Sequence, residues 1–191
     1  ATSLFEWIDA SLGRVDFLAN VAGEGILADP LEVTASQIRS VMENLVVGRY
    51  ALCQQAGRRM LARGTGSIVN ISSLAGVTAL GRGHIAYSMA MGAVAQMTRE
   101  LSTEWAGRGV RVNAVNPGYV QTGMQEREIA WEADLRRISP EQVVQGYVAD
   151  TPLGRLERPE DVAAVVAFLC GPDAGFITGE AIEVNGGAWI F

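Results

Sequence analysis

The stretch Ser67-Ile68-Val69-Asn70-Ile71-Ser72-Ser73 decides the expected fold of this chain. Its β-branched residues at positions 68, 69 and 71 predict a buried strand, and Gly64-Thr65-Gly66 breaks the chain just before it. The two serines place hydroxyl groups at the carboxyl end of that strand. The residues from Ala86 to Ala106 then predict one long helix without proline.

Expected helices and strands alternate along the whole sequence. Apolar periodicity predicts helices at residues 4–12, 34–60, 86–106 and 159–171, and strands at 15–19, 67–71, 110–115 and 181–184. The second helix begins at the capping box Thr34-x-x-Gln37. Because strands that alternate with helices are joined by right-handed crossovers, we expect an α/β fold with a parallel sheet and helices on both faces.

Sheets of this kind bind ligands beyond the carboxyl ends of their strands. Three segments fall at these ends: Asn20–Gly23, Ser72–Ser73 and Asn116–Gly118. A serine hydroxyl at the strand end and the phenol of Tyr87, near the start of the next helix, can hydrogen-bond the same carbonyl oxygen. A turn serine and a half-buried aromatic residue are the alternative interpretation.

The composition excludes several classes of function. The 191 residues carry a formal net charge of −6, which argues against nucleic-acid binding. All 15 basic residues are arginine, and the absence of lysine excludes Schiff-base, P-loop and lysine-base chemistry. The longest apolar run, Val162 to Cys170, is too short to cross a bilayer.

The expected location is the cytoplasm. The first residues include acids but no basic segment, so they are unlike a signal peptide. Cys53 and Cys170 are isolated in the sequence, which fits a reducing compartment.

Two further features have structural interpretations. Gly23-x-Gly25-x-x-Ala28 matches a dinucleotide fingerprint, but Pro30 separates it from the next helix, so we expect only a glycine-rich loop beside a ligand cleft. His84 is the only histidine and has no cysteine or acid cluster, so we expect neither a metal site nor a Ser/His/Asp triad. His84 could instead line the ligand cleft.

Six segments, in order, resemble motifs of the short-chain dehydrogenase/reductase family. They are Asn20-Val21-Ala22-Gly23, Asn44-Leu45-Val46-Val47-Gly48, Ser67 to Gly76, Arg111 to Thr122, Arg158 to Ala163 and Val184-Asn185-Gly186-Gly187. The resemblance covers essentially the whole chain. It implies the second half of a Rossmann-like parallel sheet, with about four strands.

The resemblance implies catalytic roles for three residues. Tyr87 would be the general acid/base toward the substrate oxygen, and Ser73, with Ser72 as second choice, would hold that oxygen. Asn44 would support a water in a proton relay. The implied reaction interconverts an alcohol and a carbonyl compound.

The implied cofactor is NAD or NADP. Its adenosine side would face Asn20, Ala22 and Gly23, and its nicotinamide side would face Pro117, Gly118, Val120 and Thr122. The family resemblance further implies a homodimer or homotetramer, and the apolar tail at residues 188–191 is expected at an interface.

Residues 119–158 resemble the variable substrate lid of the family. This segment carries the polar and aromatic side chains Trp131, Glu126, Glu128, Arg127 and Arg136. They would suit a small polar substrate such as a sugar or polyol. A solvated helix face is the alternative interpretation of the same residues.

One departure from the family pattern lies next to Tyr87. The family has Y-x-x-x-K, whereas Tyr87-Ser88-Met89-Ala90-Met91 places Met91 in the lysine position. The family lysine holds the nicotinamide ribose and lowers the pKa of the tyrosine. Met91 has no charge, this chain has no other lysine, and Arg99 lies too far along the helix to act in its place.

The second departure lies at the beginning of the chain. The family starts with a strand, a T-G-x-x-x-G-x-G loop and two further strands, and none of these is present. We therefore expect one Rossmann-like domain over residues 1–191 that is incomplete at its N-terminus. Its outermost strand should present an exposed apolar edge.

Three hypotheses follow for the function. The chain is part of a longer NAD(P)-dependent dehydrogenase, or it is an inactive or impaired relative that acts as an oligomerising or binding module. In the third, it is a variant altered at Met91, in which Met91→Lys would raise turnover.

Overall fold

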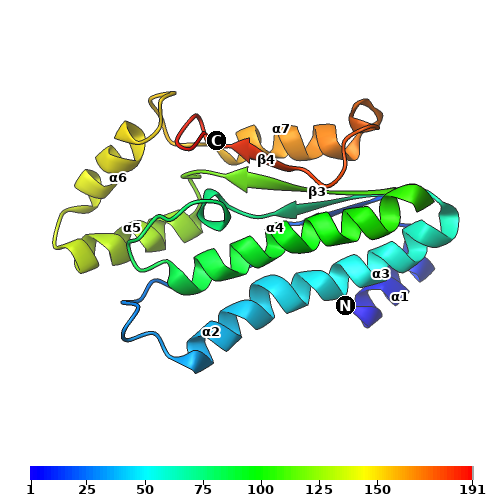
Figure 1. Cartoon of the computed structure of the whole chain (residues 1–191), viewed down its shortest axis with the longest axis horizontal. Coiled ribbons are helices and arrows are strands. Elements are labelled where there is room, and N and C mark those ends of the chain that lie inside the picture. The colour runs from blue at the N-terminus through cyan, green and yellow to red at the C-terminus, as the bar shows by residue number, and fades with distance from the viewer. Residues whose placement is uncertain (191) are drawn as a thin grey trace.

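The β-branched stretch forms β2 (Gly66–Ile71), an inner strand of a four-stranded parallel sheet. The computed structural model describes residues 1–190. Strand β2 lies between β1 (Phe17–Asn20) and β3 (Val110–Pro117), and β4 (Ala181–Val184) pairs with the other side of β3. The strand order β1-β2-β3-β4 follows the chain, which confirms the expected parallel sheet (Figure 1).

Helices cover both faces of this sheet (Figure 1). Helices α3 (Gly48–Arg63) and α4 (Ile85–Trp105) pack on one face, and α7 (Pro159–Cys170) packs on the other. Helix α1 (Thr2–Ser11) packs against α3. Short 3-10 turns at Leu74–Gly76, Ala106–Arg108 and Pro172–Ala174 complete the framework of the described residues. The expected Rossmann-like α/β fold is therefore confirmed.

The inner strands are apolar because both of their faces are buried. Ile68 and Val112 are cross-strand partners on β2 and β3, and both pack in the apolar layer beneath α3 and α4. Val69 and Val115 belong to the opposite layer, together with Leu169 of α7. Successive side chains of a strand point to opposite faces of the sheet. Each inner strand therefore contributes apolar side chains to both layers, and its sequence is a nearly continuous apolar run.

The long helix predicted from residue 34 contains a local irregularity. Helix α2 (Ala35–Met42) begins at the expected capping box, in which Thr34 Oγ1 accepts from Gln37 N at 3.2 Å and Gln37 Oε1 accepts from Thr34 N at 2.9 Å. A π-helical turn, Glu43–Val47, then joins α2 to α3. A turn of this type widens the helix and is frequent at functional sites.

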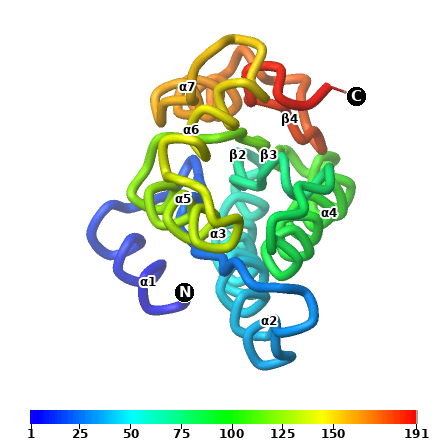
Figure 2. The backbone as a smooth tube through the Cα atoms, turned by 90° about the vertical axis from the view of Figure 1, so that its left-hand side faces the viewer, coloured from blue at the N-terminus to red at the C-terminus, as the bar shows by residue number. Residues whose placement is uncertain are grey.

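Two helices stand beyond the carboxyl ends of the strands. Helices α5 (Gly123–Arg136) and α6 (Pro140–Ala149) pack on each other and lie together at one end of the molecule (Figure 1). Figure 2 views the molecule from this end. They occupy the polar segment at residues 119–158. Their position places them over the edge of the sheet where ligands are expected.

Strand β1 lies at the edge of the sheet, as expected. Its residue Phe17 is 55% exposed and the following Val21 is 63% exposed, so this edge is apolar. Within residues 1–190, no helix has the length and apolar character needed to cross a membrane. Of the apolar tail, Phe191 lies outside the described residues.

Candidate active site

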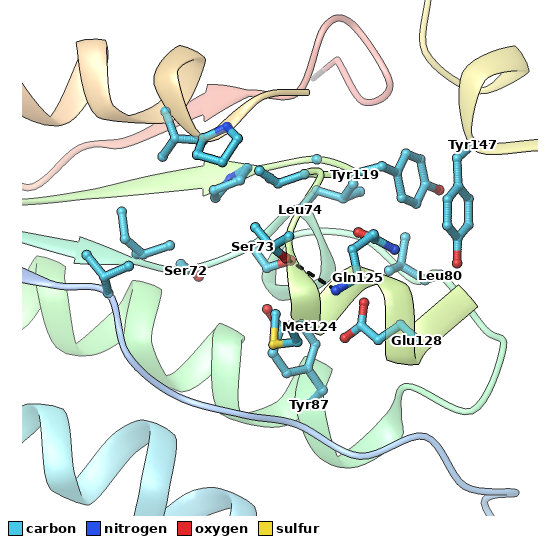
Figure 3. Close-up of a pocket in the computed structure, with 18 of the residues that line it drawn as sticks. Ser72, Ser73, Leu74, Leu80, Tyr87, Tyr119, Met124, Gln125, Glu128 and Tyr147 are labelled. Carbon is cyan, nitrogen blue, oxygen red and sulfur yellow. Dashed lines mark hydrogen bonds between the residues drawn. The ribbon is translucent and has the colours of Figure 1, made fainter. Parts of the chain in front are cut away.

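A cavity of about 560 Å³ opens beyond the carboxyl ends of β2 and β3 (Figure 3). Ser72 and Ser73 follow β2, Tyr87 lies in the first turn of α4, and residues of α5 and α6 form a further wall. Most of the lining side chains are apolar, so a few polar groups define what the cavity can bind.

The two serines have different environments. Ser72 Oγ donates a hydrogen bond to the carbonyl oxygen of Met91 at 2.9 Å, so its proton is used to join β2 to α4. Ser73 Oγ accepts from the backbone N–H of Ala75 at 3.1 Å. Ser73 therefore does not use its hydroxyl proton on the backbone, and its hydroxyl instead makes a hydrogen bond with the Tyr87 phenol at the cavity, which supports the choice of Ser73 over Ser72.

Tyr87 is packed tightly on the cavity side of α4. A Cβ atom at Gly25 would lie 2.5 Å from Tyr87 Cδ2, so the backbone of that glycine-rich loop rests directly on the ring. Burial raises the pKa of the Tyr87 phenol, and the nearby Glu128 carboxyl raises it further. The Ser73 hydroxyl and the positive charge of Arg49 act in the opposite direction.

Met91 lies one turn after Tyr87 but faces away from the cavity. Its side chain is buried in an apolar cluster with Leu45 and Val94. A thioether in this cluster supplies neither charge nor a hydrogen-bond donor to the phenol. Helix α4 thus positions Tyr87 without placing a cation beside it.

Glu128 is the acidic side chain that lines the cavity. In Figure 3 its carboxyl group lies between the rings of Tyr87 and Tyr147. Burial raises the pKa of Glu128 to about 7; Arg127 opposes the shift and Glu132 adds to it. Near neutral pH this group therefore exchanges between a hydrogen-bond donor form and an acceptor-only form.

A buried ion cluster fixes the outer wall. Glu132 is fully buried; it accepts from Tyr147 Oη at 2.5 Å, pairs with Arg136 and lies 3.5 Å from Arg82 Nε. The Tyr147 ring stacks on Tyr119, with ring centroids 4.2 Å apart. These contacts join α5, α6 and the loop before α4, so the cavity wall is built from three chain segments.

The residues predicted for the nicotinamide side come together. Pro117, Gly118, Val120 and Thr122 all line the cavity with Ser73 and Tyr87. Gly118 N–H donates to Glu157 Oε2 at 2.8 Å, which holds the loop after β3 in place. Thr122 has a structural task as well, because its Oγ1 accepts from Gln125 N at 3.2 Å and caps α5.

The residues predicted for the adenosine side do not line this cavity. Asn20 is buried and donates to Asn70 Oδ1 at 2.8 Å and to Cys53 Sγ at 3.2 Å, so its amide joins β1 to the core. Ala22 is exposed, and Gly23 lies beside the π-helical turn. Binding of adenosine by these residues stays a prediction.

Asn44 also lies away from the cavity. It is exposed on the π-helical turn, and its Oδ1 lies 3.6 Å from where a Cβ of Gly23 would stand. The structure thus brings Asn44 to the strand end that carries Asn20–Gly23 rather than to Tyr87. Its part in a proton relay stays a prediction.

The remaining sequence expectations have mixed outcomes. His84 lines the cavity, and burial lowers its pKa, so the ring is neutral near pH 7. The glycine-rich segment at residues 23–28 forms a loop without helix or strand, as expected. Of the polar lid candidates, Glu128 lines the cavity, whereas Glu126, Arg127, Trp131 and Arg136 are exposed.

The sequence analysis did not identify five residues of this region: Arg49, Arg82, Tyr119, Glu132 and Tyr147. A signal for Arg49 existed, because it interrupts the apolar stripe Leu45, Cys53, Ala56 and Met60 on one helix face. Tyr147 similarly follows Val143 by one helical turn. Nothing in the pattern indicated that Tyr147 would meet Glu132.

Known proteins resemble the chain over nearly its whole length. The family described as enoyl-(acyl carrier protein) reductase matches residues 1–188. Galactitol 2-dehydrogenase (L-tagatose-forming) of Cereibacter sphaeroides is 41% identical over 183 residues, which are 95% of this chain and 68% of that protein. A tropinone reductase homolog of Arabidopsis thaliana is 36% identical, over 92% of this chain and 62% of its own length.

A solved structure agrees with these matches. The crystal structure of an NAD⁺-bound xylitol dehydrogenase superposes with a TM-score of 0.92 at 30% identity, covering 97% of this chain and 73% of that one. The chain thus spans between three fifths and three quarters of the length of these three proteins.

We predict that Gly25→Ala displaces the Tyr87 ring, because the new methyl group would overlap it. The free energy of unfolding should fall by about 1–3 kcal/mol, measured by urea denaturation. Gly146→Ala, in α6 with open space around the new methyl group, is the matched control and should be neutral or stabilising by up to about 1 kcal/mol. Equal effects of the two substitutions would contradict the packing described for Tyr87.

We also predict that Glu128→Gln stabilises the chain at pH 8 but hardly at pH 5. The pKa of this carboxyl is raised from 4.5 to about 7 on folding, so its contribution to stability is present at low pH and is lost as pH rises through 7. After allowance for solvent screening, the gain at pH 8 should be on the order of 1 kcal/mol.

Urea denaturation at the two pH values checks this prediction. Glu126→Gln, an exposed neighbour on α5, is the matched control and should change the free energy of unfolding less than Glu128→Gln does at pH 8. A Glu128→Gln effect that is independent of pH would show that the carboxyl is not buried as described.

Proposed function

Because the chain belongs to the short-chain dehydrogenase/reductase family of oxidoreductases, we propose that it interconverts an alcohol and a carbonyl compound with NAD or NADP. The observation that carries the proposal is the meeting of Ser73 and Tyr87 at one cavity. The Ser73 hydroxyl and the Tyr87 phenol can both hydrogen-bond a single substrate oxygen there. The activity of the relatives supports this proposal at the level of the reaction class.

Tyr87 and Ser73 would have different roles at the substrate oxygen. In reduction, Tyr87 donates its phenolic proton to the carbonyl oxygen, and in oxidation it takes the proton back; Ser73 donates a hydrogen bond to the same oxygen. A bound nicotinamide would supply or accept the hydride at the adjacent carbon. Burial raises the pKa of Tyr87, so the phenol carries its proton at neutral pH, the form that donates in reduction, but it is a weaker acid than a free tyrosine.

The described residues fit the nicotinamide end of such a cofactor. The loop after β3 lines the cavity beside Tyr87 with Pro117, Gly118 and Val120, an apolar wall suited to a flat ring. The glycine-rich segment at residues 23–28 does not open a helix, so it does not provide the helix N-terminus that usually meets a pyrophosphate. We therefore assign no phosphate contact to it.

We propose a sugar or polyol as the substrate. Glu128 supports this, because a carboxylate accepts hydrogen bonds from hydroxyl groups beside the reacting carbon. The names of the relatives support it too: one is a galactitol 2-dehydrogenase and another a D-threitol dehydrogenase. The helices of residues 119–158 would act as the substrate lid.

A direct test measures NADH and NADPH formation with galactitol, xylitol and threitol, in wild type and Tyr87→Phe. Wild-type turnover should exceed that of Tyr87→Phe by about 10²-fold or more, because positioned acid–base groups contribute that much. Tyr50→Phe, an exposed tyrosine on α3, should leave turnover unchanged. Turnover that survives in Tyr87→Phe, or its absence from wild type with every substrate and cofactor, would contradict the proposal and favour the binding-module alternative.

We propose in addition that the chain forms a homodimer or homotetramer. The apolar edge at Phe17 and Val21 supports this, because an unpaired strand edge readily pairs with another chain. Light scattering at micromolar concentration should give a mass of two or four chains. A stable monomer of 20.3 kDa would contradict it.

A further inference from the structure

Arg49 is a buried cation with no acidic partner. It lies on α3 and is 5% exposed, and no salt bridge within residues 1–190 includes it. Charged side chains are rarely buried unless they are paired. Its guanidinium instead donates to backbone carbonyls: to Ile71 O through Nη1, and to Val21 O and Ala22 O, each at 3.3 Å, through Nη2.

These carbonyls fix the guanidinium at the edge of the sheet that binds ligands. Ile71 ends β2 directly before the two serines, and Val21 and Ala22 follow β1. Donation to two neighbouring strands leaves the group little freedom to rotate. The Nε–H remains buried without a hydrogen-bond partner. The Arg49 guanidinium is therefore buried at this edge of the sheet with one of its hydrogen-bond donors unused.

The glycine-rich loop connects this charge to Tyr87. A Cβ at Gly23 would lie 3.2 Å from Arg49 Nη2, and a Cβ at Gly25, two residues later, would lie 2.5 Å from the Tyr87 ring. The guanidinium and the phenol therefore contact the same short loop. With Met91 turned into the apolar cluster, α4 brings no charge of its own to this place.

We propose that Arg49 supplies, from α3, the fixed positive charge beside Tyr87 that in the family comes from the lysine position now held by Met91. Arg49 is then a positioning residue that acts through Tyr87, and it does not touch the substrate. The proposal rests on the assignment of Tyr87 as the proton donor. The experiment below measures the phenol itself, so it can fail or succeed independently of turnover.

The charges around Tyr87 support this assignment. Arg49 lowers the pKa of the phenol, Ser73 lowers it through a hydrogen bond, and Glu128 and burial raise it. The neighbouring His84, whose ring centroid lies 6.4 Å from that of Tyr87, is neutral near pH 7 because burial lowers its pKa. Arg49 is thus the cation that opposes burial and Glu128 at this phenol.

The test measures the pKa of Tyr87 in the intact chain. Tyrosine is replaced throughout by fluorotyrosine, whose phenol titrates at lower pH, and each ¹⁹F resonance is followed against pH. The Tyr87 signal is identified by its loss in Tyr87→Phe. In Arg49→Met the Tyr87 pKa should rise, because the charge that stabilises the phenolate is gone. In Arg49→Lys it should stay close to the wild-type value.

The controls separate electrostatics from folding. Arg59→Gln removes a charge from the same helix, where Arg59 pairs with Asp9 at 2.5 Å, and should leave the Tyr87 pKa unchanged. If Arg49→Met does not fold, Arg49→Gln, which keeps an N–H donor for the carbonyls, takes its place.

Two results would overturn the proposal. One is a folded neutral variant whose Tyr87 pKa equals that of wild type, because Arg49 would then have no electrostatic effect on the phenol. The other is unfolding of both Arg49→Met and Arg49→Gln while Arg49→Lys folds with a shifted Tyr87 pKa. In that case Arg49 holds the strand ends together and does not set the acidity of Tyr87.

Discussion

The hydrogen bond from Ser72 Oγ to the carbonyl oxygen of Met91 joins the end of β2 to α4, and the site depends on this junction. The junction is also close-packed, since a Cβ at Gly76 would lie 2.7 Å from the Met91 carbonyl carbon. Together these contacts set where the first turn of α4 stands relative to the strand. Tyr87 is thereby held over the cavity, and Ser73 is the serine left to face a ligand.

The same dense packing buries the ionisable groups of the site and so raises the pKa values of Tyr87 and Glu128. A buried phenol keeps its proton, and a buried carboxyl such as Glu128 does the same up to about neutral pH. Acid–base chemistry at Tyr87 therefore requires a compensating positive charge. The structure has one such charge in Arg49, held by carbonyl groups at the sheet edge, on a different helix from the one that carries Met91.

The sequence predicts much of the fold and about half of the site. Strands such as 67–71 and the capping box at Thr34 are local patterns, and the structure reproduces them. Arg49 was not predicted because arginine is normally exposed. Only the tertiary structure shows that backbone carbonyls at two strand ends accept hydrogen bonds from its guanidinium. The contact between Glu132 and Tyr147, which lie 15 residues apart in the sequence, is likewise set by tertiary packing.

The proposed function requires that the cavity at the carboxyl ends of β2 and β3 hold a nicotinamide beside Tyr87. Chemical-shift mapping by NMR with nicotinamide mononucleotide tests it most directly, since this ligand needs no adenosine site. We predict that the shift changes gather at Ser73, Tyr87 and residues 117–122. Changes confined to the groove at the opposite ends of the strands, where Phe17 and Cys170 lie, or no changes at millimolar ligand, would contradict the account.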